Sequence, residues 1–555
     1  MHLRLLALCA LVVAALFAAG CGSSDSDSDS GSRASGSGGT TAAGSGVASE
    51  AVPPPAVGDV DRVTWALTYG EPPSLDWLRS ADYSPSSVIA NLCESLMRIE
   101  PDMTFAQGLA RSVDHPRPDT WVYELRDDVR FWDGTPMTAD DVVFSLTRAA
   151  DPANGSPWTT AYQNVRGIKA TGPSQVTVTL RRPDALFPKF MATPAGAVGS
   201  RAFVTRAGRA YGTPSGGVMC TGPFELGDWR QGSSITLRRN EGYWDEERRA
   251  HAGEVEFRFV SDEATLTSAL RTGEIDGAYN VPPSSFAQLR AADGTLWIHP
   301  GLQSVTMTTI GSARPGNSLH DLRVRQALRL ALDYEGISNG IFAGAASPMR
   351  SHLTPSTWGY SRPIFEAAYE ALPPAETDME AARRLVAEAR PSKPIRLAAP
   401  SEAKDLMQVA TAIQDAGTKA GLDVELKPMP TAEFVRIYFD EKARAEVDAA
   451  IVFGYLDFPE PVEQQIKLLT GSFYNFPGYA NPEYDALVQR AWATDDDDAR
   501  AELVVQAQEI LVRDLPTLPI VARDVALFMN ERITGAPGTF DYLYYPWAAD
   551  VGAAR

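Results

Sequence analysis

The sequence predicts an α/β protein with more than one lobe, and two observations support this prediction. The chain has 555 residues, whereas a single hydrophobic core stops growing at roughly 250–300 residues. From Arg62 onward, segments in which apolar and polar residues alternate are interspersed with segments of helical apolar spacing. Both element types therefore recur along the chain, as α/β folds require.

Each predicted element rests on its own apolar pattern. Alternation or clustering of β-branched residues predicts strands at residues 63–67, 175–180, 234–237 and 255–260. The spacing over 321–333 predicts a helix with five apolar residues on one face: Val324, Ala327, Leu328, Ala331 and Leu332. Residues 484–512 hold two helical runs that break near the acidic run 495–498. That run lacks the spaced ligands and the glycine of an EF-hand loop, so we interpret it as a solvated helix start.

Composition and motifs exclude several classes of function. A formal net charge of −20 repels nucleic acid. None of the four cysteines lies in a CxxC pair, and the six histidines lack HExxH spacing, so no metal site is predicted. The sequence contains no Walker A, GxGxxG or GxSxG motif, and therefore predicts neither a cofactor nor an enzyme.

The N-terminus reads as an export signal. Residues 5–20 carry no charge and are too few to span a bilayer, and small residues precede Cys21. This ending resembles the lipobox of bacterial lipoproteins, although Ala18 stands where leucine is commonest. It implies a signal peptide over 1–20 and a lipid on the Cys21 thiol. The alternatives are an ordinary signal peptide and an uncleaved membrane anchor.

The following segment, 21–59, is rich in Gly, Ser and Asp and ends in a proline run. Such a composition cannot bury a core, so it predicts a flexible tether.

Six segments occur in the order found in the family 5 solute-binding proteins of ABC importers, the oligopeptide- and dipeptide-binding group. They are residues 71–76 (EPPSLD), 91–96 (NLCESL), 121–142 (WVYELRDDVRFWDGTPMTADDV), 221–224 (TGPF), 239–244 (RNEGYW) and 322–333 (LRVRQALRLALD). The chain therefore resembles that family along nearly its whole mature length, and the segment 121–142 is the most specific match. Physically, Gly134 suits a turn, and Thr138 with Asp141 suits a helix-capping box. We therefore expect this segment to build a turn and a helix start and not to contact the ligand.

The resemblance implies a two-lobed periplasmic-binding-protein-like α/β fold with mixed sheets, a hinge between the lobes and an extra subdomain on the first lobe. The ranges that it implies are 60–102, 213–302 and 524–555 for lobe I, 103–212 for the extra subdomain and 303–523 for lobe II.

Asp457 is the leading candidate for ligand contact. It follows the apolar run 449–454, which reads as a buried strand, and ligands collect beyond the carboxyl ends of such strands. The segment resembles the family's "xxADYxxP" stretch, whose aspartate binds the α-ammonium of a peptide. The alternative is that Asp457 only caps the turn at Pro459.

Four aromatic residues and one arginine are weaker candidates. Phe453 and Tyr455 flank the predicted strand end, while Trp358 and Tyr360 lie in a loop after a helix. Aromatic side chains there can clamp a peptide backbone or stack on a sugar. Arg350 is a candidate for a ligand carboxylate.

Cys93 and Cys220 lie beside family motifs of the first lobe, and export permits a disulfide between them. Two buried free thiols remain the alternative.

The resemblance implies a monomer, lipid-anchored at the outer face of the cell membrane, that passes a peptide or similar small solute to ABC permease and ATPase subunits. Three alternatives stay open: another solute such as an oligosaccharide, haem or nickel chelate, a sensor lipoprotein without transport, and an extracellular hydrolase.

Overall fold

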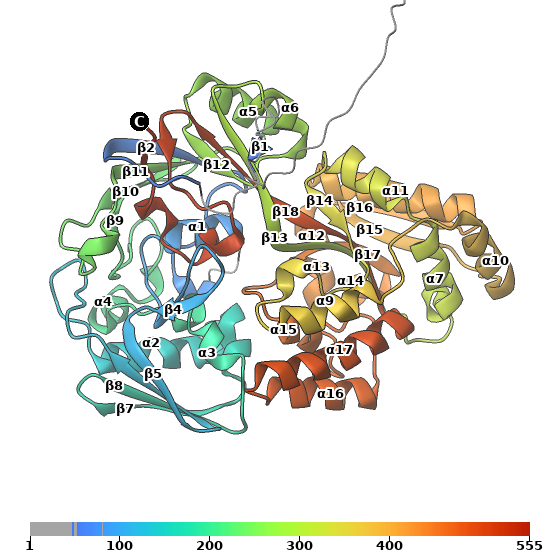
Figure 1. Cartoon of the computed structure of the whole chain (residues 1–555), viewed down its shortest axis with the longest axis horizontal. Coiled ribbons are helices and arrows are strands. Elements are labelled where there is room, and N and C mark those ends of the chain that lie inside the picture. Colours follow the sequence, from blue (N-terminus) through green and yellow to red (C-terminus); the bar gives the residue numbers. More distant parts are fainter. Residues whose placement is uncertain (1–46, 49–52, 80–81) are drawn as a thin grey trace, which may run out of the picture. The chain divides into compact units, whose positions relative to one another are not determined.

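The computed structural model of the protein describes residues 47–48, 53–79 and 82–555 (Figure 1). The predicted signal peptide over 1–20 and Cys21 lie outside the described residues, as does most of the predicted tether over 21–59. Within the described ranges, no helix is both long enough and apolar enough to cross a membrane.

A 12-stranded mixed sheet forms the framework. Ten of its strands follow one another in the order β16 (Val424–Met429), β15 (Ile395–Pro400), β17 (Ala449–Tyr455), β13 (Gly294–Thr309), β18 (Thr517–Asn530), β12 (Gly277–Tyr279), β2 (Val60–Leu67), β11 (Ala252–Phe259), β10 (Ser234–Arg239) and β9 (Phe224–Arg230). The other two are β1 (Val47–Ala48), which pairs with β13, and β14 (Ala346–Pro348), which pairs with β18.

The long strands β13 and β18 run side by side through the centre of this sheet (Figure 1). Their antiparallel register shifts between Pro300 and Gln303 and again between Val305 and Thr306. Such irregularities bend a strand and increase its local twist. The central pair is therefore least regular between the two halves of the sheet, where Gln303 pairs with Arg523.

Helices cover the half of the sheet that contains β15, β16 and β17. Their apolar residues share a buried core with these strands. The main contributors are α7 (Leu322–Ala331), α10 (Met379–Ala389) and α11 (Lys404–Ala420). The same part of the chain contains α8 (Tyr334–Gly336), α9 (Arg362–Glu370), α12 (Thr431–Phe434), α13 (Arg436–Phe439), α14 (Glu441–Ala445), α15 (Pro461–Ile466), α16 (Pro482–Trp492) and α17 (Asp497–Asp514).

In the other half, residues of β2, β12, β13 and β18 share a core with α5 (Glu263–Thr272) and α6 (Phe286–Leu289). In the chain, β2 is followed by α1 (Tyr83–Ile89) and by the hairpin of β3 (Met97–Ile99) and β4 (Phe105–Gln107). The C-terminal segment contributes the short pair β19 (Ile533–Thr534) and β20 (Gly552–Ala553).

A separate antiparallel sheet has the order β5 (Ala110–Arg117), β6 (Thr120–Leu125), β8 (Gln175–Leu180) and β7 (Val165–Gly172). It packs against α2 (Ala139–Ala150) and precedes α3 (Phe187–Phe190) and α4 (Arg201–Ala207). The predicted capping box is confirmed, because Thr138 and Asp141 bond reciprocally at the start of α2. Gly134 has a φ of 81°, which the predicted turn requires.

Two acids join the motif segments to one another. Glu94 accepts hydrogen bonds from Thr221 Oγ1 (2.8 Å), Tyr243 Oη (2.8 Å) and Trp244 Nε1 (2.9 Å), so three segments meet at one carboxylate. Arg148 of α2 donates two hydrogen bonds, of 2.8 and 2.6 Å, to Asp76. The motif segments thus contribute to the framework of the fold.

Beside Glu94, the structure has a disulfide bond between Cys93 and Cys220, with Cα atoms 4.9 Å apart.

The predicted elements are confirmed with shifts of a few residues at their ends. The predicted strand over 175–180 coincides with β8, and the predicted helix over 321–333 is α7. The acidic run separates α16 from α17 as predicted, with Asp496 as the N-cap of α17.

Candidate ligand-binding site

The candidate site lies at the carboxyl end of β17. This strand pairs in parallel with β15 and antiparallel with β13, and its first three residues are buried. The chain leaves the sheet after Tyr455 and enters α15 at Pro461. Asp457 therefore stands in the short connection just beyond a central strand, where ligands gather in open α/β sheets.

The Asp457 carboxylate is half-buried and has one hydrogen-bond donor within the described residues. Tyr544, from the C-terminal segment, donates its hydroxyl to Asp457 Oδ1 at 2.5 Å. The backbone N–H of Asp457 donates to Glu463 Oε2 at 3.0 Å. Lys467 Nζ donates to the Tyr455 carbonyl at 3.1 Å and lies 3.5 Å from Glu463 Oε1.

The electrostatics of this group favour an additional cation. Burial raises the pKa of Asp457, and the Tyr544 hydroxyl and Lys467 only partly oppose that shift. Burial also raises the pKa of Glu463 to about 8, and the charge of Asp457 contributes to the rise. Two carboxylates share one ammonium, Lys467, so full ionisation leaves one negative charge in excess. A ligand ammonium beside Asp457 would balance it.

A cluster of aromatic side chains includes Phe453 and Tyr455, the residues of β17 that shortly precede Asp457 in the chain. The ring centroid of Tyr83 on α1 lies 6.0 Å from that of Phe453 and 5.5 Å from that of Tyr455. Phe540 lies 5.3 Å from Tyr455. The structure thus brings Phe453 and Tyr455 together with Asp457, and Tyr83 and Phe540 join them.

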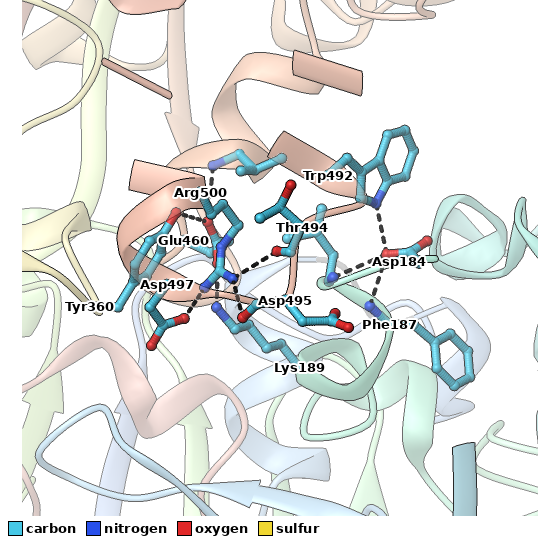
Figure 2. Close-up of polar contacts among 12 residues, drawn as sticks. Asp184, Phe187, Lys189, Tyr360, Glu460, Trp492, Thr494, Asp495, Asp497 and Arg500 are labelled. Carbon is cyan, nitrogen blue, oxygen red and sulfur yellow. Dashed lines mark hydrogen bonds and ion pairs between the residues drawn. The ribbon is translucent and has the colours of Figure 1, made fainter. Parts of the chain in front are cut away.

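The structure places Tyr360 in a different cluster, which is centred on Glu460 (Figure 2). The Tyr360 hydroxyl donates to Glu460 Oε1 at 2.9 Å, and Lys189 donates to Glu460 Oε2. Arg500 Nε lies 3.6 Å from Glu460 Oε2, and its guanidinium carbon is 4.0 Å from the centre of the Tyr360 ring. This contact orients the Tyr360 ring toward a cation of the protein itself.

The Glu460 cluster continues into a second set of contacts around Asp184 (Figure 2). Trp492 Nε1 donates to Asp184 Oδ1 at 2.7 Å, and the Ala185 N–H donates to the Trp492 carbonyl at 2.9 Å. Residues 184–189 are thereby connected to α16 and α17.

Trp358 and Arg350 are also engaged away from Asp457. The Trp358 ring packs on Phe365 and Tyr369 of α9. Arg350 donates to the Tyr369 carbonyl and to the Glu370 carboxylate. We therefore leave Trp358, Tyr360 and Arg350 out of the site proposed below.

Sequence reasoning missed Tyr544, Glu463 and Lys467. Tyr544 lies 87 residues from Asp457, and no local pattern marks it. Glu463 and Lys467 carry a usable signal, because four residues separate them on and just after α15. Within the described residues, no group of three or more His, Cys, Asp and Glu side chains is placed to hold a metal ion.

This mixed α/β fold is the fold of the two-lobed periplasmic binding proteins, as the solved structures described below show. Residues 104–476 match the family described as bacterial extracellular solute-binding proteins, family 5. Because this match covers more than half of the chain, the protein belongs to that family.

Relatives and solved structures agree with this assignment. The chain is 27% identical over 505 residues to the periplasmic oligopeptide-binding protein OppA of Salmonella typhimurium, covering 87% of this chain and 91% of OppA. It is 25% identical over 508 residues to the dipeptide-binding protein DppE of Bacillus subtilis, covering 86% and 89%.

Three solved structures have the same fold. CtaP of Listeria monocytogenes has a TM-score of 0.77 at 21% identity, with 90% of this chain and 100% of CtaP covered. AgaA of A. tumefaciens R10, in complex with agropinic acid, has 0.76 at 22%, with 89% and 99% covered. NikZ of Campylobacter jejuni, in complex with Ni(L-His), has 0.75 at 19%, with 89% and 99% covered.

Proposed function

We propose that this protein captures short peptides with a free amino end and delivers them, as a lipid-anchored monomer, to an ABC importer. Solute-binding proteins of this family are the binding components of ABC importers, and the curated relatives above are named as oligopeptide- and dipeptide-binding proteins. Their permease and ATPase subunits are the partners that we propose for this chain.

Asp457 carries the proposal for the ligand. It is a half-buried carboxylate beyond a central strand, with one hydroxyl donor and a raised pKa. A peptide ammonium would supply the charged hydrogen bond that this carboxylate lacks, worth roughly 1.5–3 kcal/mol.

Calorimetric titration of the mature protein with Ala-Ala and with N-acetyl-Ala-Ala tests the ligand. We expect acetylation to weaken binding at least tenfold, because it removes the positive charge. Equal affinity for the two peptides would contradict the proposed contact between Asp457 and the ligand ammonium.

The relative motion of the lobes is part of the same proposal. We place lobe I at 60–102, 213–302 and 524–555, its extra subdomain at 103–212, and lobe II at 303–523. The pairing of Gln303 with Arg523 next to a register shift supports a hinge in the two central strands. Small-angle scattering with and without Ala-Ala tests it, and we expect the radius of gyration to fall on binding.

A different small solute is the second candidate. AgaA in complex with agropinic acid and NikZ in complex with Ni(L-His) have the same fold, so the fold alone does not select peptides. The mass of any ligand that copurifies and is released by gentle denaturation distinguishes a peptide from these alternatives.

The lipid anchor rests on Cys21 and the small residues before it. The mass of the membrane-extracted protein tests it. We expect loss of residues 1–20 and a mass increase from acyl chains. An unmodified N-terminus would contradict the anchor.

A further inference from the structure

Arg523 is a nearly buried cation on the same face of the sheet as the candidate site. Gln303 of β13 pairs with Tyr455 of β17 on one side and with Arg523 of β18 on the other. Directly paired residues of antiparallel strands present their side chains on the same face. Tyr455, Gln303 and Arg523 therefore form a row across three neighbouring strands, and Asp457 lies two residues beyond one end of it.

The surroundings of Arg523 leave much of its hydrogen-bonding capacity unused. The residue is 8% exposed, and a guanidinium carries five N–H donors. Within the described residues, its acceptors are Asp405, with 3.5 Å between Arg523 Nη1 and Asp405 Oδ2, and the Tyr69 hydroxyl. A desolvated cation with so few acceptors is costly unless another acceptor reaches it.

Gln303 provides an independent sign of a missing ligand. It is 1% exposed and donates from Nε2 to the Tyr83 hydroxyl at 3.1 Å. Its other amide atom, Oε1, is buried without a hydrogen-bond partner in the described part of the chain. Buried polar atoms are nearly always paired in native structures, so Oε1 is an acceptor whose hydrogen bond is still to be made.

Aromatic rings line this row. The Arg523 guanidinium carbon lies 5.1 Å from the centre of the Phe453 ring, and Tyr83 covers Phe453 and Tyr455. Tyr69 stacks on Tyr83 with ring centroids 4.7 Å apart, and it is 44% exposed. The row thus has apolar walls and an outer side that solvent reaches.

We infer that Arg523 binds the carboxylate of the ligand, so that the site selects di- and tripeptides with both ends free. This inference rests on the proposed capture of an amino end by Asp457. Adjacent strands lie ~4.8 Å apart and successive residues ~3.3 Å apart, which puts the α-carbons of Asp457 and Arg523 ~12 Å from each other. Two or three extended residues bridge that gap once the side chains reach inward. Gln303 Oε1, midway along the row, would accept the peptide N–H.

Calorimetric titration of the wild-type protein with Ala-Ala, Ala-Ala-NH₂, N-acetyl-Ala-Ala, Ala-Ala-Ala and penta-alanine tests the inference. We expect the C-terminal amide to weaken binding about 10- to 100-fold relative to Ala-Ala, since it removes a charge-assisted bond. We also expect Ala-Ala and Ala-Ala-Ala to bind more tightly than penta-alanine. Equal affinity for Ala-Ala and Ala-Ala-NH₂ overturns the inference and leaves the amino-end proposal standing. Failure of every peptide to bind overturns both.

Variants assign the effect to a residue. Arg523→Gln should bind Ala-Ala and Ala-Ala-NH₂ with nearly equal affinity. It should still bind Ala-Ala more tightly than N-acetyl-Ala-Ala. Arg523→Lys keeps the charge without the guanidinium fork and should retain a reduced preference. Arg384→Gln, on the exposed side of α10, is the matched control and should leave both ratios unchanged. Loss of the carboxylate preference in Arg350→Gln, with Arg523→Gln unaffected, would contradict the inference.

Discussion

Two carboxylates stand three residues apart after β17, and the structure treats them differently. Glu460 is fully buried, faces the cations of Lys189 and Arg500, and accepts a hydrogen bond from the Tyr360 hydroxyl. Asp457 is half-buried and receives one hydroxyl, from Tyr544, with Lys467 as the nearby cation. We conclude that an acid at a strand end stabilises the fold when the protein itself supplies its cations. When the protein does not supply enough cations, the acid can bind a cationic group of a ligand.

The largest effect on stability is expected when the buried acid Glu460 is replaced. Glu460→Gln should lower the free energy of unfolding by about 3–5 kcal/mol, because Lys189 and Arg500 lose their buried counter-ion. Urea denaturation measures this change. Glu380→Gln on α10, whose side chain is 89% exposed, is the control and should change stability by less than about 0.5 kcal/mol. A loss of the same small size in both variants would contradict the structural role of Glu460.

The second prediction concerns replacement of Asp457, the acid that we propose binds the ligand. Asp457→Asn should leave the free energy of unfolding unchanged or raise it, because burial disfavours the charged form. Its affinity for Ala-Ala should fall about 10- to 100-fold. Asp415→Asn on α11, with a 60% exposed side chain, is the control: it should leave the affinity unchanged and lower the free energy of unfolding by less than about 0.5 kcal/mol. Strong destabilisation by Asp457→Asn would place Asp457 in the same class as Glu460.

The third prediction concerns the removal of one cation, Lys189, from the Glu460 cluster. Lys189→Met should cost about 1–3 kcal/mol of stability, less than Glu460→Gln, since Arg500 still faces the carboxylate. Thermal unfolding compares it with Lys419→Met, an exposed pair on α11 whose loss should cost about 0.3–0.5 kcal/mol. Equal shifts in the two variants would show that Lys189 behaves as an ordinary surface lysine.

The last prediction is a dependence of stability on pH that comes from the Asp457 side. Burial raises the pKa of Glu463 from 4.5 to about 8. Between these values the folded state holds a proton that the unfolded state releases, so stability falls as the pH rises. Glu463 contributes at most about 1.4 kcal/mol per pH unit to this slope, the limit for one proton. Asp524 and Asp541, whose pKa values burial raises to about 6 and about 7, contribute in the same range. Urea denaturation from pH 4.5 to 8 measures the slope, and Glu463→Gln should lower it by the Glu463 contribution. An unchanged slope in that variant would assign the effect to other groups.

Local patterns predicted the framework and the position of the leading site residue. The run 449–454 identified a buried strand, and the position of Asp457 just beyond it followed from the sheet. The same reasoning could not separate Asp457 from Glu460, because their partners come from distant segments. Tyr544 is 87 residues away from Asp457, and Lys189 is 271 residues away from Glu460.

Aromatic residues in loops were the least predictable. Trp358 and Tyr360 looked like ligand platforms, but Trp358 packs on α9 and Tyr360 faces Arg500. Arg523 gave no signal, because it lies in an apolar strand and becomes distinctive only through its pairing with Gln303.

A cycle of two proteins and two ligands tests the central claim most directly. The affinities of wild-type protein and Asp457→Asn for Ala-Ala and for N-acetyl-Ala-Ala give the coupling between the carboxylate and the ammonium. We predict that acetylation weakens binding to the wild type at least tenfold and changes binding to Asp457→Asn less than twofold. An equal loss on acetylation in both proteins would contradict the assignment of the amino end to Asp457.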